Sequence, residues 1–124
     1  MSSEENAKGV KFVRAKTKGR KEHEKLYGKR LRISRHTWKI IYCNDLSYDG
    51  VFIAGLCSPQ NFTIYIAIDH EDVHSTLLHE IFHAEVFASG LRQRHDWCMN
   101  MEEQLVEMFS VSVASIFTLR KKAG

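Results

Sequence analysis

The sequence predicts an α+β fold, in which a small antiparallel or mixed sheet of about three strands packs against two helices. Segments rich in large and β-branched residues come first, at residues 38–43, 51–57 and 62–68. Two longer segments follow, at residues 70–89 and 101–120, and their apolar residues recur at helical spacing. A strand, a hairpin and two helices in this order fit a sheet that is covered by both helices.

The three strand segments are separated by residues that favour turns. Asn44-Asp45 and Tyr48-Asp49-Gly50 follow the first segment, and both are typical turn signals. The second and third segments, residues 51–57 and 62–68, are separated by the Ser-Pro-Gln-Asn sequence at 58–61. This spacing predicts a β-hairpin.

The first long helix, residues 70–89, is bounded by residues that start and stop helices. Asp69 can cap its beginning, and Asp72 adds a charge that suits the helix dipole. Gly90 is a plausible C-terminal stop. Six large apolar residues give the helix an apolar body: Leu77, Leu78, Ile81, Phe82, Val86 and Phe87.

This helix contains an H-E-x-x-H motif, formed by His79, Glu80 and His83. An α-helix turns about 100° per residue, so positions four apart lie on nearly the same face. Both imidazoles can therefore reach one metal ion, and Glu80 can accept a proton from a water bound to that ion. The motif predicts two zinc ligands and a general base.

A catalytic zinc ion is usually held by three protein ligands, so we expect a third ligand downstream. The second helix contains Glu103 and Glu107, which are four residues apart and share a face. Glu103 could bind zinc while Glu107 accepts the distal N–H of a zinc-bound imidazole and fixes its tautomer. Glu102 is the alternative ligand, but Val106 lies four residues after it, where a carboxylate is wanted.

His95 is a further candidate, in the loop at residues 92–97. It could be an ordinary loop histidine, a catalytic donor that stabilises the transition-state oxyanion, or the third zinc ligand in place of Glu103.

The HEIFH motif, followed by Glu103, Val106, Glu107 and Phe109, resembles the gluzincin metallopeptidases. The likeness covers residues 36–119 and is greatest to the small ImmA/IrrE-like proteins of phages, prophages and bacteria. It implies a zinc metalloendopeptidase that cleaves a protein substrate, such as a repressor or a host factor. It also implies that a strand of the hairpin, at the edge of the sheet, receives an extended peptide by β-augmentation.

A second family, the SprT-like proteases, is the alternative resemblance, with His95 as the third ligand. In that family a glycine usually follows this histidine, whereas this chain has Asp96.

Charge is distributed unevenly along the 124 residues. Thirteen of the 18 lysines and arginines lie within residues 8–39, and residues 1–39 contain four acids. The net charge of +3 therefore combines a basic N-terminal part with an acidic remainder. We expect a basic arm at residues 1–35, disordered over residues 1–20 with a short helix at 22–31, and a zincin-like domain at residues 36–124.

The basic residues within 8–39 indicate a nucleic-acid or other polyanion contact, or a solvated tail. A binding module with a structural or vestigial zinc site is accordingly the alternative to the peptidase. The chain has no apolar run of membrane-spanning length and no signal peptide, and Cys43, Cys57 and Cys98 have no C-x-x-C spacing. These features predict a cytoplasmic protein with reduced thiols and no membrane partner.

Overall fold

The computed structural model describes residues 8–70 and 72–116, and its fold is α+β, as the sequence predicts. The strands are β1 (Val10–Arg14), β2 (Arg30–Ile33), β3 (His36–Tyr48), β4 (Val51–Phe52), β5 (Gly55–Ser58) and β6 (Thr63–Ala67). The α-helices are α1 (Thr17–Tyr27), α2 (Val73–Ser89) and α3 (Met99–Ile116), with 3-10 turns η1 (Pro59–Asn61) and η2 (Leu91–Gln93).

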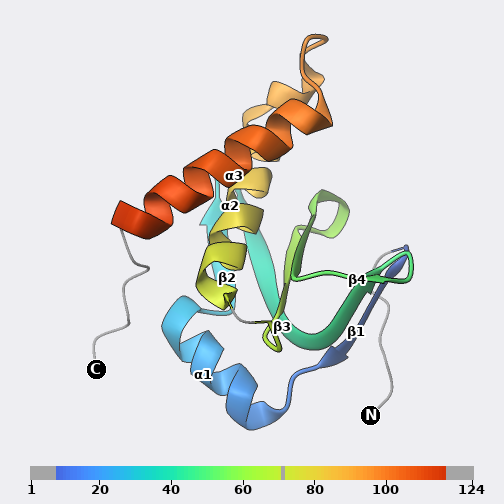
Figure 1. The fold of residues 1–124 in the computed structure, drawn as a ribbon, viewed down its shortest axis with the longest axis vertical. Helices are drawn as coiled ribbons and strands as arrows, with labels where there is room; N and C mark the ends of the chain where they lie inside the picture. Colours follow the sequence, from blue (N-terminus) through green and yellow to red (C-terminus); the bar gives the residue numbers. More distant parts are fainter. Residues whose placement is uncertain (1–7, 71, 117–124) are drawn as a thin grey trace.

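The strands form one mixed sheet, in which β3 is the central strand (Figure 1). The order is β1-β3-β6-β5, and β2 and β4 also pair with β3. β3 and β6 are parallel, and the other pairs are antiparallel. The predicted mixed sheet and the hairpin of β5 and β6 are therefore confirmed, but the prediction of about three strands is wrong because the sheet has six.

Much of the predicted basic arm belongs to this sheet. β1 and β2 both pair with β3, and α1 begins at Thr17. The prediction of disorder over residues 1–20 is therefore wrong for residues 10–14 and 17–20. Apolar residues at every second position explain this, because Val10 and Phe12 are buried while Lys11 is exposed. The predicted disorder of residues 1–7 lies outside the described part of the chain, and the predicted helix at 22–31 is found at Thr17–Tyr27.

A bulge bends the long strand β3. Its register with β1 shifts between Lys11 and Val13, and Asp45 has a positive φ of 53°. Aspartate tolerates this left-handed conformation better than most residues do. The predicted turn at Asn44-Asp45 is therefore a bulge within the strand, whereas Asp49 and Gly50, with φ of 48° and 83°, form the turn into β4.

The two faces of the sheet bury different sets of side chains. One face packs against α2 through a cluster that includes Trp38, Ile40, Ile64 and Leu77. The other face buries a second cluster, in which Phe12 of β1 packs with residues of β3 and with Tyr65 of β6. α2 packs on the first of these faces, and α3 crosses α2 and packs against it (Figure 1).

α2 begins later than the sequence predicts, and a different residue caps it. The Asp72 carboxylate accepts a hydrogen bond from the Ser75 backbone N–H at 2.9 Å. Asp69, the predicted cap, instead accepts a bond from the Asp45 backbone N–H at 3.2 Å, which ties the chain to the bulge in β3. Gly90 ends α2 with a positive φ of 79°, as predicted.

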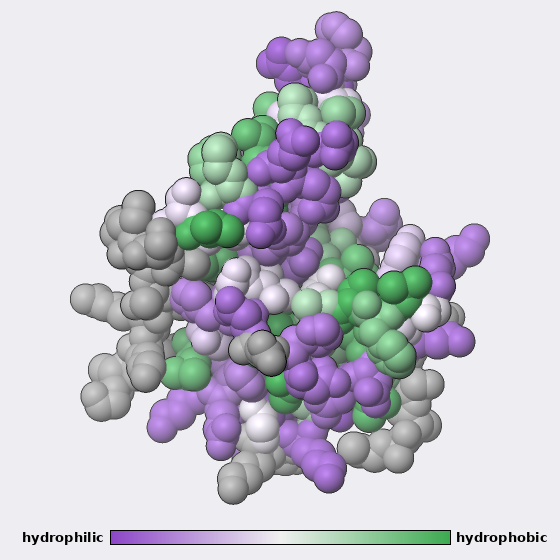
Figure 2. Space-filling model, in the orientation of Figure 1, coloured by the Kyte–Doolittle hydropathy of each residue, from purple (hydrophilic) through white to green (hydrophobic). Residues whose placement is uncertain are grey.

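Apolar side chains are exposed at two places in the view of Figure 2. One lies along α3, where Met108, Phe109 and Val111 are each at least half exposed. The other lies over β4, where Val51 and Phe52 are 65% and 71% exposed. In the part of the chain that the structure describes, no helix is both long and apolar enough to cross a membrane.

We predict that Asp72→Ala lowers the free energy of unfolding by about 1 kcal/mol, because the first turn of α2 loses its cap. Asp72→Asn should retain most of the stability, because an asparagine side chain caps equally well. Urea denaturation followed by circular dichroism measures both variants. Equal losses for alanine and asparagine would show that the cap is not the cause.

Candidate metal centre

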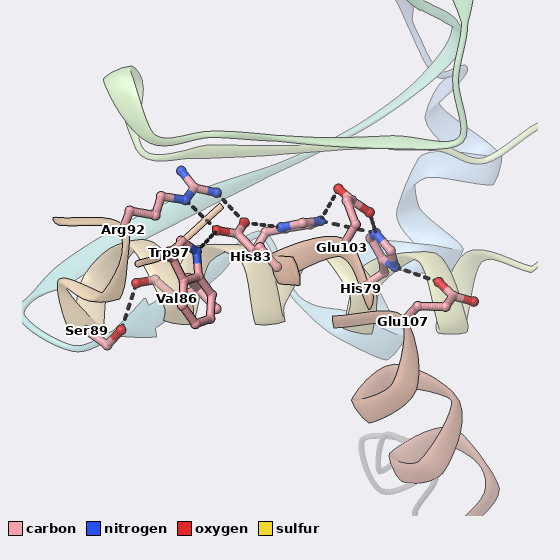
Figure 3. Close-up of polar contacts among 9 residues, drawn as sticks. His79, His83, Val86, Ser89, Arg92, Trp97, Glu103 and Glu107 are labelled. Carbon is pink, nitrogen blue, oxygen red and sulfur yellow. Dashed lines mark hydrogen bonds and ion pairs between the residues drawn. The ribbon is translucent and has the colours of Figure 1, made fainter. Parts of the chain in front are cut away.

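His79, His83 and Glu103 come together where α3 crosses α2 (Figure 3). The two histidines occupy successive turns of one face of α2, and their Nε2 atoms are 3.2 Å apart. Glu103 of α3 lies over both, with carboxylate oxygens 2.9 Å from His83 Nε2 and 3.4 Å from His79 Nε2. Two helices thus direct two imidazole nitrogens and one carboxylate to a single point.

The outer nitrogens of both rings face carboxylates. His83 Nδ1 is 2.6 Å from Glu102, and His79 Nδ1 is 3.1 Å from Glu107. A carboxylate accepts, so each Nδ1 acts as the donor, and Nε2 is the ring nitrogen that is left to bind a metal ion. The three atoms that converge are therefore all acceptors, and a cation between them satisfies them.

The spacing of the three acceptors suits a small divalent ion. A tetrahedral zinc site with bonds of about 2.0–2.1 Å has neighbouring ligand atoms about 3.3 Å apart. The two imidazole nitrogens, 3.2 Å apart, are close to that edge length, and one ligand atom from each of the three residues lies within 4.8 Å of the others. Two nitrogens and one oxygen form a typical donor set for zinc.

Glu102 anchors the site from behind. Its side chain is fully buried, and its carboxylate accepts bonds from Arg92 Nε at 2.8 Å, from an Arg92 terminal nitrogen at 2.6 Å and from Trp97 Nε1 at 3.2 Å. Burial by itself would raise the pKa of Glu102, but the hydrogen bonds from Arg92, His83 and Trp97 outweigh it and lower the pKa to about 2. This ionised carboxylate fixes the His83 ring.

Glu80 lines the same cavity as His79, His83 and Glu103, but its carboxyl group is bonded to the backbone of β5. Its side chain is 7% exposed, and the Cys57 backbone N–H of β5 donates to it. Burial raises its pKa to about 8, the charge of Glu103 adds to the rise, and the Cys57 bond partly opposes it. A carboxyl group with this pKa can take up or release a proton near neutral pH.

The close approach of β5 to α2 depends on a glycine. A Cβ atom at Gly55 would lie 2.7 Å from Thr76 Cγ2 and 3.1 Å from the Glu80 side chain. A larger residue there would push the strand away from Glu80. The glycine therefore lets the strand edge lie directly beside the candidate base.

A cavity of about 330 Å³ opens onto the site. His79, His83, Glu80 and Glu103 line one side, and β5 lines the other through Gly55, Leu56 and Cys57. A larger hollow of about 780 Å³ continues past the same strand and shares Tyr48, Leu56, Cys57, Arg92 and Met99 with the first. Together they form a path along β5 that leads to the three acceptors.

The structure brings together most of the residues that the sequence singled out. Glu103 contacts both His79 and His83, and Glu107 contacts His79. Glu80 lines the same cavity as His79, His83 and Glu103. His95 is exposed after η2 and is outside the group of described residues that could hold a metal.

Sequence reasoning missed the role of Glu102. The sequence presents Glu102 only as an alternative ligand, because the apolar Val106 lies one turn after it. Both residues are indeed buried, but Arg92 and Trp97 supply the partners that helix spacing could not show. A tryptophan and an arginine in the loop that enters α3 were the available signal.

Comparison of the chain with protein-family models, with curated proteins and with solved structures finds no match.

We predict that Glu102→Gln lowers the free energy of unfolding by about 3 kcal/mol near neutral pH, because Arg92 loses its buried partner. The folded-state pKa of about 2 lies below the ordinary value of 4.5. Ionised Glu102 therefore stabilises the fold above that ordinary value, and this stabilisation is lost as the pH falls toward 2.

Urea denaturation at about pH 7 and about pH 3 should show the difference between wild type and Glu102→Gln shrinking at the lower pH. Glu107→Gln is the control, because Glu107 is 65% exposed and its loss should cost less than about 0.5 kcal/mol. A difference between wild type and Glu102→Gln that is the same at both pH values would contradict this account.

Proposed function

We propose that the chain is a zinc-dependent metallopeptidase, with His79, His83 and Glu103 as zinc ligands and Glu80 as the general base. One observation carries the proposal. Three acceptor atoms converge beside a buried carboxyl group, in a cavity that is bounded by an edge of the sheet. A metal, a base and a place for an extended chain are the parts that peptide hydrolysis requires.

Several features favour a catalytic over a structural metal. Structural zinc is usually enclosed by four protein ligands, whereas three groups of the described chain converge here. Glu103 is 55% exposed and the site faces a cavity, which leaves room for a water and a substrate. A binding module with a structural metal remains the alternative, and a fourth protein ligand would support it.

Glu80 has the properties of a general base. When bound, zinc lowers the pKa of a coordinated water and polarises the scissile carbonyl. The positive charge also favours the ionised form of Glu80, whose pKa is otherwise about 8. Glu80 can then accept a proton from the attacking water and deliver it to the leaving amine.

β5 is suited to hold the substrate. It is the last strand of the main sheet path, and β6 pairs with one of its edges. An extended peptide that adds to its other edge would run past Glu80 and the zinc ligands. Tyr48 and Ile53, which flank the exposed apolar surface of β4, line the same cavity and suit apolar substrate side chains (Figure 2).

We predict that the wild-type chain binds one zinc ion and cleaves peptides, while Glu80→Gln keeps the zinc and loses at least about 100-fold in activity, because the base is removed. His79→Ala should lose the metal as well as the activity, because one of three ligands is absent. Elemental analysis of the purified proteins and a mixed pool of quenched fluorescent peptides measure the two properties.

Glu85→Gln is the matched control, because Glu85 is an exposed glutamate on the same helix outside the cavity. It should keep both zinc and activity. A wild type without zinc at saturating supply would exclude the metal centre. A zinc-loaded wild type that is inactive on every peptide of the pool would favour the binding module instead.

A second prediction concerns protons. Near neutral pH and without metal, most Glu80 side chains are protonated, because the pKa is about 8. Zinc binding should ionise Glu80, so wild type should release about one proton more than Glu80→Gln. Titration calorimetry in buffers of different ionisation enthalpy counts these protons. Equal release from both proteins would show that Glu80 is not coupled to the metal.

A further inference from the structure

A second concave site, the basic cavity, shares no lining residue with the cavity at the metal centre. Its volume is about 740 Å³. Its charged lining residues come from β1, α1, the turn after α1, β2 and β3, and they are five cations and one acid: Arg14, Arg20, Lys29, Arg30, Lys39 and Glu24. This excess of positive charge in one hollow suits an anion that carries several charges.

Arg30 and Lys39 are the two cations that lie directly opposite each other, in the register of β2 and β3. Like charges at directly opposed positions destabilise an antiparallel pair. Both side chains are exposed, and the one acid of the lining, Glu24, makes its ion pairs with Arg20 and Lys29 instead, at 3.4 and 3.8 Å. A carboxylate bound between Arg30 and Lys39 would relieve their repulsion.

One row of residues across the sheet connects the basic cavity with β5. Ser58 of β5 lies opposite Thr63 of β6, and Thr63 in turn pairs with Lys39 of β3. Lys39 lies opposite Arg30 of β2. Residues that pair directly point to the same face of a sheet, so these four side chains share one face. Adjacent strands are about 4.8 Å apart, so Lys39 is about 10 Å from Ser58.

The hollow of about 780 Å³ reaches from the metal centre to this row. It shares Leu56 and Cys57 with the cavity at the metal centre, and Ser58 also lines it. Leu56 and Cys57 point to opposite faces, because their partners in β6 belong to the two different core clusters. The hollow therefore passes around the edge of β5 from one face to the other. It adjoins the basic cavity at Asn61, which lines both.

We propose, on the basis of the peptidase function proposed above, that the basic cavity holds an acidic segment of the same substrate chain that is cleaved at the metal centre. Arginine suits this role because it binds a carboxylate through two parallel hydrogen bonds. A peptide is favoured over other polyanions because the hollow that leads to the cavity follows the edge of a strand, where a polypeptide backbone can pair.

The geometry also gives the position of the acidic segment. The distance along β5 from Gly55 to Ser58 is about 10 Å, and the distance across the sheet from Ser58 to Lys39 is about the same. An extended peptide spans about 3.3 Å per residue. The acids should therefore lie about six residues from the scissile bond.

Cleavage kinetics of the zinc-loaded full chain test the proposal. A peptide that the wild type cleaves is extended with about four glutamates, placed about six residues before or after the cleaved bond, and matched peptides carry glutamines instead. One of the two glutamate peptides should be cleaved at least about tenfold more efficiently than its glutamine counterpart. The gain should be a lower KM, because a contact far from the reacting atoms is the same in the ground state and the transition state.

Arg30→Glu should abolish this preference and leave kcat for the glutamine peptide unchanged. The substitution replaces a like-charge pair with Lys39 by an opposite-charge pair, so the melting temperature should stay equal or rise by about 2 °C. Lys11→Glu is the matched control with the same change in net charge. Lys11 is exposed on β1 and lines none of the three hollows, so the preference should change by less than about twofold.

A binding measurement separates this proposal from the peptidase proposal. Fluorescence anisotropy of full-length Glu80→Gln with a labelled peptide that has about four glutamates at one end requires no cleavage. At about 50 mM salt this peptide should bind at least about tenfold more tightly than its glutamine counterpart, and the difference should shrink at about 200 mM. Binding that Arg30→Glu abolishes, in a chain that cleaves no peptide, would contradict the peptidase alone. Cleavage with no preference for acids would contradict the acidic segment alone.

Three results would overturn the proposal. The first is equal binding of the glutamate and glutamine peptides at the lower salt concentration. The second is an equal loss of preference in Lys11→Glu and Arg30→Glu, which would indicate a response to net charge alone. The third is an oligothymidine with the same number of charges that displaces the glutamate peptide at a tenth of the concentration that the unlabelled peptide needs, which would identify a phosphate site.

Discussion

The buried carboxylate of Glu102 joins three parts of the chain that are separate in sequence. Arg92 and Trp97 reach it from the connection between the helices, and His83 reaches it from α2, while Glu102 itself belongs to α3. An unpaired charge at this depth would be very costly, so the fold requires all of these donors. The same contacts fix the crossing of α2 and α3, and Glu103, the next residue, is thereby placed over both histidines.

The two carboxylates on the imidazoles differ in environment and therefore in effect. Glu102 is fully buried and ionised, so it holds His83 in one orientation. Glu107 is mostly exposed, so its contact with His79 is weaker and costs little to break. His83 is therefore held firmly, whereas the contacts of the more exposed His79 and Glu103 leave those two groups adjustable. A cavity beside the two adjustable groups is consistent with a site that exchanges ligands.

The site also depends on the edge of the sheet. Gly55 permits β5 to approach α2 closely enough for the Cys57 backbone to reach Glu80. The Cys57 bond thus ties β5 to the candidate base, and in the proposed mechanism a peptide paired with β5 would lie close to the proposed zinc ligands.

The sequence predicted the parts of the molecule that local spacing determines. Residues four apart on a helix share a face, and by this rule His79 lies beside His83, while Glu103 and Glu107 both face His79. The hairpin of β5 and β6 and the stop at Gly90 followed from turn residues in the same way. The role of Glu102 as a buried, ionised carboxylate could not be predicted from helix spacing. It depends on hydrogen bonds from Arg92 and Trp97, which lie outside the helix.

The first two strands were missed for a different reason. Basic residues alternate with apolar ones in β1 and β2, and the high positive charge suggested a tail. The alternation of Leu31 and Ile33 with Arg30 and Arg32 was the better guide, since period-two burial describes a strand whatever the charge of its exposed face. β1 and β2 form strands because they pair with β3, which is distant in sequence. Composition alone does not predict such long-range pairing.

X-ray absorption spectroscopy of the zinc-loaded protein tests the central claim most directly, because it counts the imidazoles and identifies the other donor atoms. Two imidazoles with oxygen donors, all about 2.0–2.1 Å from the metal, are the result that His79, His83, Glu103 and a water predict. A third imidazole, as His95 would supply, or a sulfur at about 2.3 Å would contradict the account.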